Sequence, residues 1–226
     1  MILEKSNKIM NRYLIFILFI ITFYSIPLYA QYDIQKGKEL IKKSSSIYKS
    51  YQTVKADFKL TSENKMDNTK SLMNGTFYLK DKNFRLILGD QIVICDQKNM
   101  WTYLKEVNEV QINTYDPDAL EINPNNLFIM WETGYLCGYA GTTNDKGKVL
   151  DLIELTPEDK SKPYFKVKLY LDKSTSHVQK VMIFEKNSSI TTFEIKSMSP
   201  NVNLSDDLFK FNASKYPGVE IIDLRD

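Results

Sequence analysis

The sequence is poor in the residues that metal sites and many hydrolytic sites require. Its 226 residues include one histidine, His177, and two cysteines, Cys95 and Cys137. One histidine cannot build a His-rich metal centre. It could pair with a serine, but the sequence has no Gly-x-Ser-x-Gly motif, phosphate loop or dinucleotide glycine motif. We therefore expect a protein that is not an enzyme and needs no metal or other cofactor.

The sequence also lacks an excess of charge. Its 30 basic and 28 acidic residues give a net charge of +2, too little for the basic face that binds nucleic acid. Three of the basic residues and one acidic residue fall within residues 1–30, so residues 31–226 contain 27 of each. The small surplus therefore belongs to the N-terminal segment.

That N-terminal segment has the pattern of a secretory signal peptide. A basic region ends at Arg12, an apolar run covers residues 13–24, and Ala30 suits cleavage before Gln31. Pro27 keeps the run below the roughly 20 residues of a membrane-spanning helix, although a retained anchor is the alternative. Residue 31 is not a cysteine, so no lipid can be attached there. We expect a soluble exported protein in which residues 31–226 form a single domain.

The reactive side chains do not form a recognisable site. An exported protein can oxidise Cys95 and Cys137, but two cysteines do not make a disulfide framework. One bridge and two buried thiols both remain open. His177 follows Ser174, Thr175 and Ser176 in an expected hairpin turn, so we expect a solvated loop histidine.

The hydrophobic pattern predicts one helix followed by many strands. Spacings of 3 and 4 from Ile34 to Tyr51, with Asp33 as N-cap, indicate the helix. Alternation then predicts strands, with Gly75 as a bulge or bend. The predicted strands cover residues 54–61, 71–80, 84–88, 91–95, 100–104, 109–114, 135–141, 148–156, 164–172, 178–185 and 190–197, with another at 219–224. A short helix is predicted over Asn125–Glu132.

Several middle strands are apolar on both faces. In one of them Phe84, Leu86 and Leu88 point one way and Ile87 the other. An antiparallel sheet with two apolar faces must be covered on both sides. Helices can cover one face, while the other can line the inside of a curled sheet that holds a ligand cavity. An ordinary sandwich core remains the alternative on this pattern alone.

The order of motifs resembles the LolA family of periplasmic lipoprotein carriers, in its Bacteroidetes-type members. The resemblance is carried by Asn74-Gly75-Thr76-Phe77-Tyr78-Leu79-Lys80, Phe84-Arg85-Leu86, Ile92-Val93-Ile94-Cys95-Asp96, Met100-Trp101-Thr102-Tyr103, Asn108-Glu109-Val110-Gln111 and Pro217-Gly218-Val219. It implies a mainly β fold with some α. This fold is an incomplete antiparallel β-barrel of about 11 strands, with an N-terminal helix and a helical lid enclosing an apolar cavity.

The resemblance also implies a function. The protein would shield the acyl chains of lipoproteins and move them through the periplasm from the inner to the outer membrane. Its partners would be acylated lipoproteins, the inner-membrane lipoprotein-releasing ABC transporter and an outer-membrane receptor, and we expect a monomer. The alternatives are an exported β-rich protein that binds another apolar ligand, such as a glycolipid or pigment, and a structural or adhesive envelope protein with a filled core.

Candidate site residues follow from the apolar strands and from the resemblance. The expected cavity wall is Val54, Phe58, Phe77, Leu79, Phe84, Leu86, Ile92, Ile94, Trp101, Tyr103, Val110 and Ile112, and the expected lid is Leu127, Phe128, Met130 and Trp131. A one-residue slip would reverse the facing of any strand. Family members also hold the lid through a basic residue in a basic-Pro turn. This sequence has no proline there, so Lys80, Lys82 and Arg85 are the candidates for that role.

Overall fold

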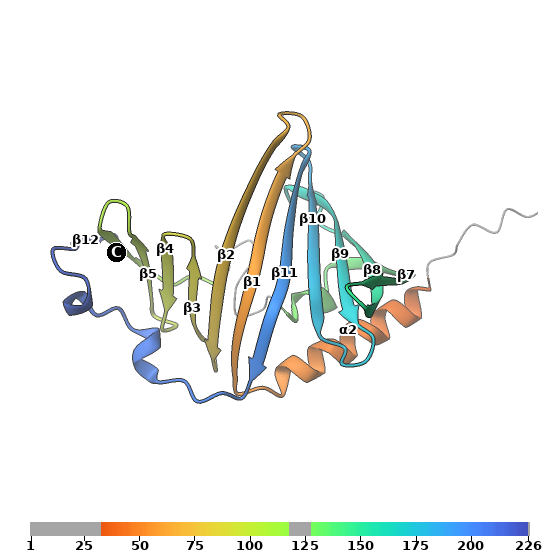
Figure 1. The fold of residues 1–226 in the computed structure, drawn as a ribbon, viewed down its shortest axis with the longest axis horizontal. Coiled ribbons are helices and arrows are strands. Elements are labelled where there is room, and N and C mark those ends of the chain that lie inside the picture. The colour runs from red at the N-terminus through yellow and green to blue at the C-terminus, as the bar shows by residue number, and fades with distance from the viewer. Residues whose placement is uncertain (1–32, 118–127, 226) are drawn as a thin grey trace, which may run out of the picture. The chain divides into compact units, whose positions relative to one another are not determined.

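Twelve strands form one open sheet in the computed structural model, which describes residues 33–117 and 128–225 (Figure 1). The strands are β1 (Thr53–Asn64), β2 (Thr69–Lys80), β3 (Asn83–Leu88), β4 (Gln91–Cys95), β5 (Asn99–Leu104), β6 (Glu109–Thr114), β7 (Tyr135–Asp145), β8 (Lys148–Pro157), β9 (Tyr164–Asp172), β10 (Val178–Glu185), β11 (Ser189–Pro200) and β12 (Glu220–Asp223). The predicted signal peptide lies outside the described residues.

The strand order is β12-β6-β5-β4-β3-β2-β1-β11-β10-β9-β8-β7. The sheet does not close, because β12 and β7 are its two ends, so the prediction of a mainly β, incomplete barrel is confirmed. The twelfth strand, β12, falls in the further strand predicted at residues 219–224. One pairing is also not antiparallel, since β12 runs parallel to β6. A parallel pair cannot be joined by a short turn, and here β7 to β11 lie between β6 and β12 in the chain.

Helix α2 (Ile34–Lys49) is the predicted N-terminal helix. The Asp33 side chain caps it by accepting a hydrogen bond from the Lys36 backbone N–H at 2.8 Å. Its buried face includes the predicted Gly37, Ile41 and Tyr48, but Ile34 is exposed. The helix lies so close to β7 that a Cβ on Gly37 would come within 2.6 Å of the Cys137 sulfur.

Side-chain alternation gives the sheet two distinct faces. We call the face that carries Phe58, Phe77 and Leu169 the inner face, and the face that carries Arg85 and Glu194 the outer face. The fully buried inner-face side chains of β8 and β9 are Ile153, Leu155, Val167, Leu169 and Leu171. They belong to the same cluster as Ile41 and Tyr48 of α2. The core therefore lies between α2 and the inner face of β7 to β10.

The outer face of β3 to β6 is covered by the C-terminal tail, residues 201–225. The tail contains two 3₁₀ turns, η4 (Asp206–Phe209) and η5 (Ala213–Lys215). Phe209 is buried, and Tyr103 of β5 packs against Tyr216 with ring centroids 4.4 Å apart. This cover explains why the middle strands are apolar on both faces.

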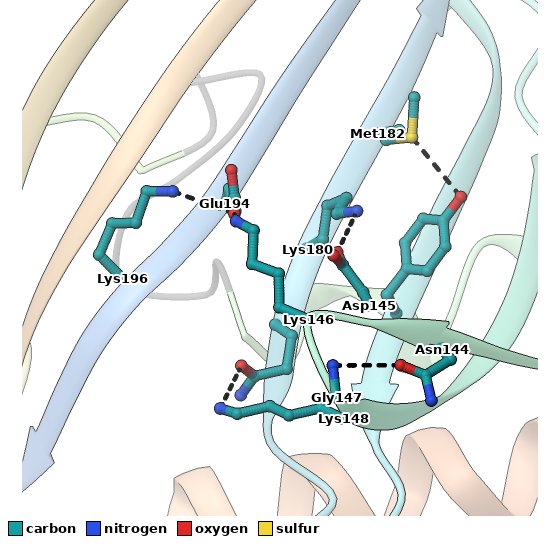
Figure 2. A network of polar contacts seen from close by, with 11 residues as sticks. Asn144, Asp145, Lys146, Gly147, Lys148, Lys180, Met182, Glu194 and Lys196 are labelled. Carbon is teal, nitrogen blue, oxygen red and sulfur yellow. Dashed lines mark hydrogen bonds and ion pairs between the residues drawn. The ribbon is translucent and has the colours of Figure 1, made fainter.

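On the outer face, the tip of the β7–β8 hairpin is joined to β10 and β11 by ion pairs (Figure 2). Lys180 of β10 lies 2.7 Å from Asp145. Glu194 of β11 lies between Lys146 of the hairpin and Lys196, and these two ammonium groups lower its pKa to about 2. The hairpin tip thus reaches past β9 to strands that are not its neighbours in the sheet.

Candidate functional site

An apolar cavity of about 210 Å³ lies on the inner face of the long central strands. Its lining comes from β1, β2, β3, β10 and β11, with one residue from the segment before β7. The lining residues, all apolar, are Ala56, Phe58, Leu60, Phe77, Leu86, Leu88, Phe128, Val178, Val181, Phe193 and Ile195. Such a surface offers dispersion and hydrophobic contact without directional bonds, so it suits a flexible apolar ligand.

Gly75 shapes the floor of this cavity. Gly75 is predicted as a bulge or bend; it is not a bulge, because its pairing with Phe58 of β1 and Leu88 of β3 is regular. A Cβ at Gly75 would lie 2.4 Å from the Phe58 ring and 2.9 Å from the Ile87 carbonyl oxygen. The glycine therefore lets the Phe58 ring lie directly over β2. The register shift occurs instead between Asp57 and Phe58, in the pairing of β1 with β11.

Phe128 closes the side of the cavity that is next to α2. Its ring stacks on Tyr48 with centroids 4.4 Å apart and an angle of 6°, and it meets the edge of Phe77 at 6.5 Å. The Tyr48 hydroxyl accepts a hydrogen bond from the Val178 backbone N–H at 3.0 Å, and burial raises the pKa of Tyr48. The helix, the start of β10 and Phe128 are thus held as one unit.

The predicted helical lid is not confirmed. Within the predicted Asn125–Glu132 helix, the structure shows a turn at Phe128 and Ile129 and then a single 3₁₀ turn, η3 (Met130–Glu132). Leu127 and residues 125–126 lie outside the described residues. Trp131 is buried in the core and Met130 packs against it. Glu132 forms an ion pair with Lys49 of α2 at 2.7 Å, and that hydrogen bond lowers the pKa of Glu132.

The register divides the expected cavity wall between the two faces of the sheet. Six of the twelve residues lie on the inner face: Val54, Phe58, Phe77, Leu79, Phe84 and Leu86. Among them Phe58, Phe77 and Leu86 line the cavity. The other six lie on the outer face, in pairs with Arg85, Ile87 or each other: Ile92, Ile94, Trp101, Tyr103, Val110 and Ile112. Both faces of these strands are apolar, so alternation could not choose between them.

Sequence reasoning missed the part of the wall that the later strands supply. Val178 and Val181 of β10 and Phe193 and Ile195 of β11 line the cavity. The sequences of β10 and β11 show the same alternation of apolar and polar residues that predicts β1. What the sequence did not show is that β11, far along the chain, pairs with β1 and places Phe193 opposite Leu60.

Two of the three candidate lid-holding basic residues bind the C-terminal tail. Lys80 donates to the Leu204 carbonyl at 3.1 Å and forms an ion pair with Asp206 at 2.6 Å. Arg85 donates to the Leu208 carbonyl and to the Tyr216 hydroxyl, each at 3.3 Å. Lys82 is exposed in the turn between β2 and β3.

The structure also shows the surroundings of the two cysteines and the histidine. Cys95 and Cys137 are both buried free thiols, and burial raises the pKa of Cys95 to about 11. The expectation of a solvated His177 is wrong. Its ring is partly buried beside Tyr48, its Nε2 lies 2.7 Å from the Tyr51 hydroxyl, and burial lowers its pKa.

An open β-sheet with a helix on one face and a cavity without polar lining is an architecture suited to an apolar ligand. Residues 49–212 match the family model of the outer membrane lipoprotein carrier protein LolA. The chain therefore belongs to the LolA family, whose carriers are non-enzymatic binding proteins. No helix in the described residues is long and apolar enough to cross a membrane.

Individual similar proteins are distant. An uncharacterized protein of Methanocaldococcus jannaschii is 26% identical over 182 residues, covering 76% of this chain and 50% of that protein. The chain thus spans about half the length of this relative. A crystal structure of an uncharacterized conserved protein from Thermus thermophilus has a TM-score of 0.54 at 10% identity, covering 83% of this chain and 99% of the other. A LolA superfamily protein from Nitrosomonas europaea has a TM-score of 0.42 at 12% identity, with coverages of 77% and 97%.

Proposed function

We propose that this protein is a periplasmic carrier that shields the acyl chains of lipoproteins and moves them from the inner to the outer membrane. The observation that carries the proposal is the wholly apolar lining of the inner-face cavity in a LolA-family chain. Each exposed CH₂ group costs about 0.8 kcal/mol in water, so acyl chains in transit need such a cover. The protein would act without catalysis, as a monomer exported by its N-terminal signal.

The carrier would receive lipoproteins from the lipoprotein-releasing ABC transporter and pass them to an outer-membrane receptor. The cavity of about 210 Å³ is below the roughly 300–1,000 Å³ of sites for drug-sized ligands. Loading several acyl chains therefore requires the walls to move apart. Phe128 is the lining residue that belongs to no strand, so we expect its ring to leave the stack with Tyr48 before any strand pairing breaks.

The wholly apolar lining also suits a second candidate, a carrier of another apolar ligand, such as a glycolipid or pigment, because it contains no polar group that selects one ligand. Mass spectrometry of lipids that copurify with the protein separates the two candidates. Acylated lipoprotein fragments are the expected result. A single glycolipid or pigment in stoichiometric amount would favour the second candidate.

Displacement of a fluorescent fatty-acid probe by a triacylated lipoprotein tests the proposed site. Leu60→Trp should weaken probe binding about tenfold or more, because the larger side chain would occupy the space that the ligand needs. Thr61→Trp is the matched control, because its side chain lies on the outer face of the same strand. We also expect Phe128→Asp to abolish loading while the β-sheet circular dichroism spectrum is retained. An absence of saturable probe binding to the unaltered protein would refute the proposal.

A further inference from the structure

A second cavity, of about 420 Å³, lies on the outer face, between β2–β3 and the C-terminal tail. We call it the tail pocket. Tyr78 and Arg85 line it from the sheet, and Asp207, Lys210, Lys215 and Tyr216 line it from the tail. It is separated from the apolar cavity by the sheet itself, since Arg85 and Leu86 are consecutive residues that line opposite cavities.

The charges in the tail pocket are not balanced. Arg85, Lys210 and Lys215 bring three cations, while Asp207 is the one acidic residue in the lining. Within the described residues, neither Lys210 nor Lys215 forms a hydrogen bond or an ion pair through its ammonium group, whereas Lys80 nearby is paired with Asp206. Cations gathered at a concave wall create a positive potential that attracts an anion.

Arg85 is the best-placed donor of the three. It uses two of its nitrogens on the Leu208 carbonyl and the Tyr216 hydroxyl. A guanidinium has five N–H groups, so three of them have no acceptor among the described residues. A planar guanidinium with free N–H groups fits the oxygens of a phosphate, especially when further cations are near.

Tyr216 adds an oriented hydroxyl to this wall. Its ring stacks on Phe211 with centroids 5.0 Å apart and packs against Tyr103 at 4.4 Å. Because its oxygen accepts a hydrogen bond from Arg85, its own proton is available to a ligand. The pocket thus offers a guanidinium, two ammonium groups and a hydroxyl around one space. That space is within the size range of small-molecule sites and larger than a lone phosphate needs.

We propose that the tail pocket binds a phosphate ester, either the phosphate of a lipid headgroup or that of a small soluble molecule. This site is independent of acyl-chain carriage, because it lies on the other face of the sheet. Its ligand would hold the C-terminal tail against β3 by joining Arg85 to Lys210 and Lys215.

Binding can be measured on the purified protein with three probes: inorganic phosphate, glycerol 3-phosphate, and phosphatidylcholine vesicles with or without phosphatidylglycerol. Calorimetry serves for the soluble probes and cosedimentation for the vesicles. We expect saturable binding that is weakened about tenfold in Lys210→Ser/Lys215→Ser, since each charge-assisted hydrogen bond contributes more than a neutral one. These lysines are exposed, so the variant should fold. Arg85→Gln should weaken binding further.

The matched control is Lys82→Ser/Lys98→Ser, which removes two exposed lysines outside the pocket. If the protein binds phosphatidylglycerol vesicles and only the pocket variant loses this binding, the ligand is a lipid headgroup. If the protein binds glycerol 3-phosphate but not the vesicles, the ligand is a soluble ester. Both results support the proposal. An absence of saturable binding, or equal weakening in both double variants, overturns it. Fatty-acid probe binding should be unchanged in the pocket variant, so failure here leaves the carrier proposal standing.

Discussion

The inner face of the sheet has two regions of the same chemistry and different packing. Over β8 and β9 it is fully buried, with Ile153 and Val167 at 0% exposure. Over β1, β3 and β11 the lining residues Leu60, Leu88 and Phe193 are only partly buried beside the cavity. Helix α2 packs on the first region, and this packing ends near Tyr48, whose ring stacks on Phe128. An apolar face left uncovered by its own chain is available to a ligand.

Truncating side chains in the two regions should show the largest difference. Leu169→Ala in the packed region should lower the free energy of unfolding by about 3 kcal/mol, because it removes buried contacts and leaves a void. Leu60→Ala should cost only about 1 kcal/mol, since its side chain already borders an opening. Urea unfolding followed by circular dichroism measures both. Equal costs would mean that the cavity region is packed as tightly as the core.

Gly75→Ala should distort the cavity region specifically. The new methyl group would overlap the Phe58 ring, so we expect a loss of about 1–3 kcal/mol in unfolding free energy together with weaker fatty-acid probe binding. Phe58→Leu should relieve the overlap, and in the double variant the two costs should not add. Additive costs in this double-mutant cycle would show that the Phe58 ring does not rest on Gly75.

The smallest effect concerns His177, which lies where the two regions meet. Burial lowers its pKa below the ordinary 6.5, although Asp172 acts in the opposite direction. The unfolded chain then binds more protons than the folded chain below pH 6.5, so stability should fall slightly as the pH decreases through that range. His177→Gln should remove this pH dependence. As the only histidine, it gives one NMR titration, whose midpoint should lie below 6.5; a midpoint at or above 6.5 would contradict this placement.

Local pattern was enough to predict most elements of the fold. The strands β4, β6, β9 and β10 have the predicted bounds, and Asp33 caps the helix as expected. These features depend on neighbours within a few residues, where alternation and capping act. The facing of Ile94 and Trp101 could not be predicted in this way, because both faces of their strands are apolar and long-range pairing chooses between them.

The sequence by itself determined a mainly β fold and predicted an export-type N-terminus and an apolar ligand site, because charge, alternation and motif order are local or compositional properties. Only the tertiary structure decided which residues line that site. It joined β1 to β11, placed Phe58 over Gly75 and used the tail to cover the outer face. Such contacts join residues far apart in the chain, and their free energy depends on packing that no single segment contains.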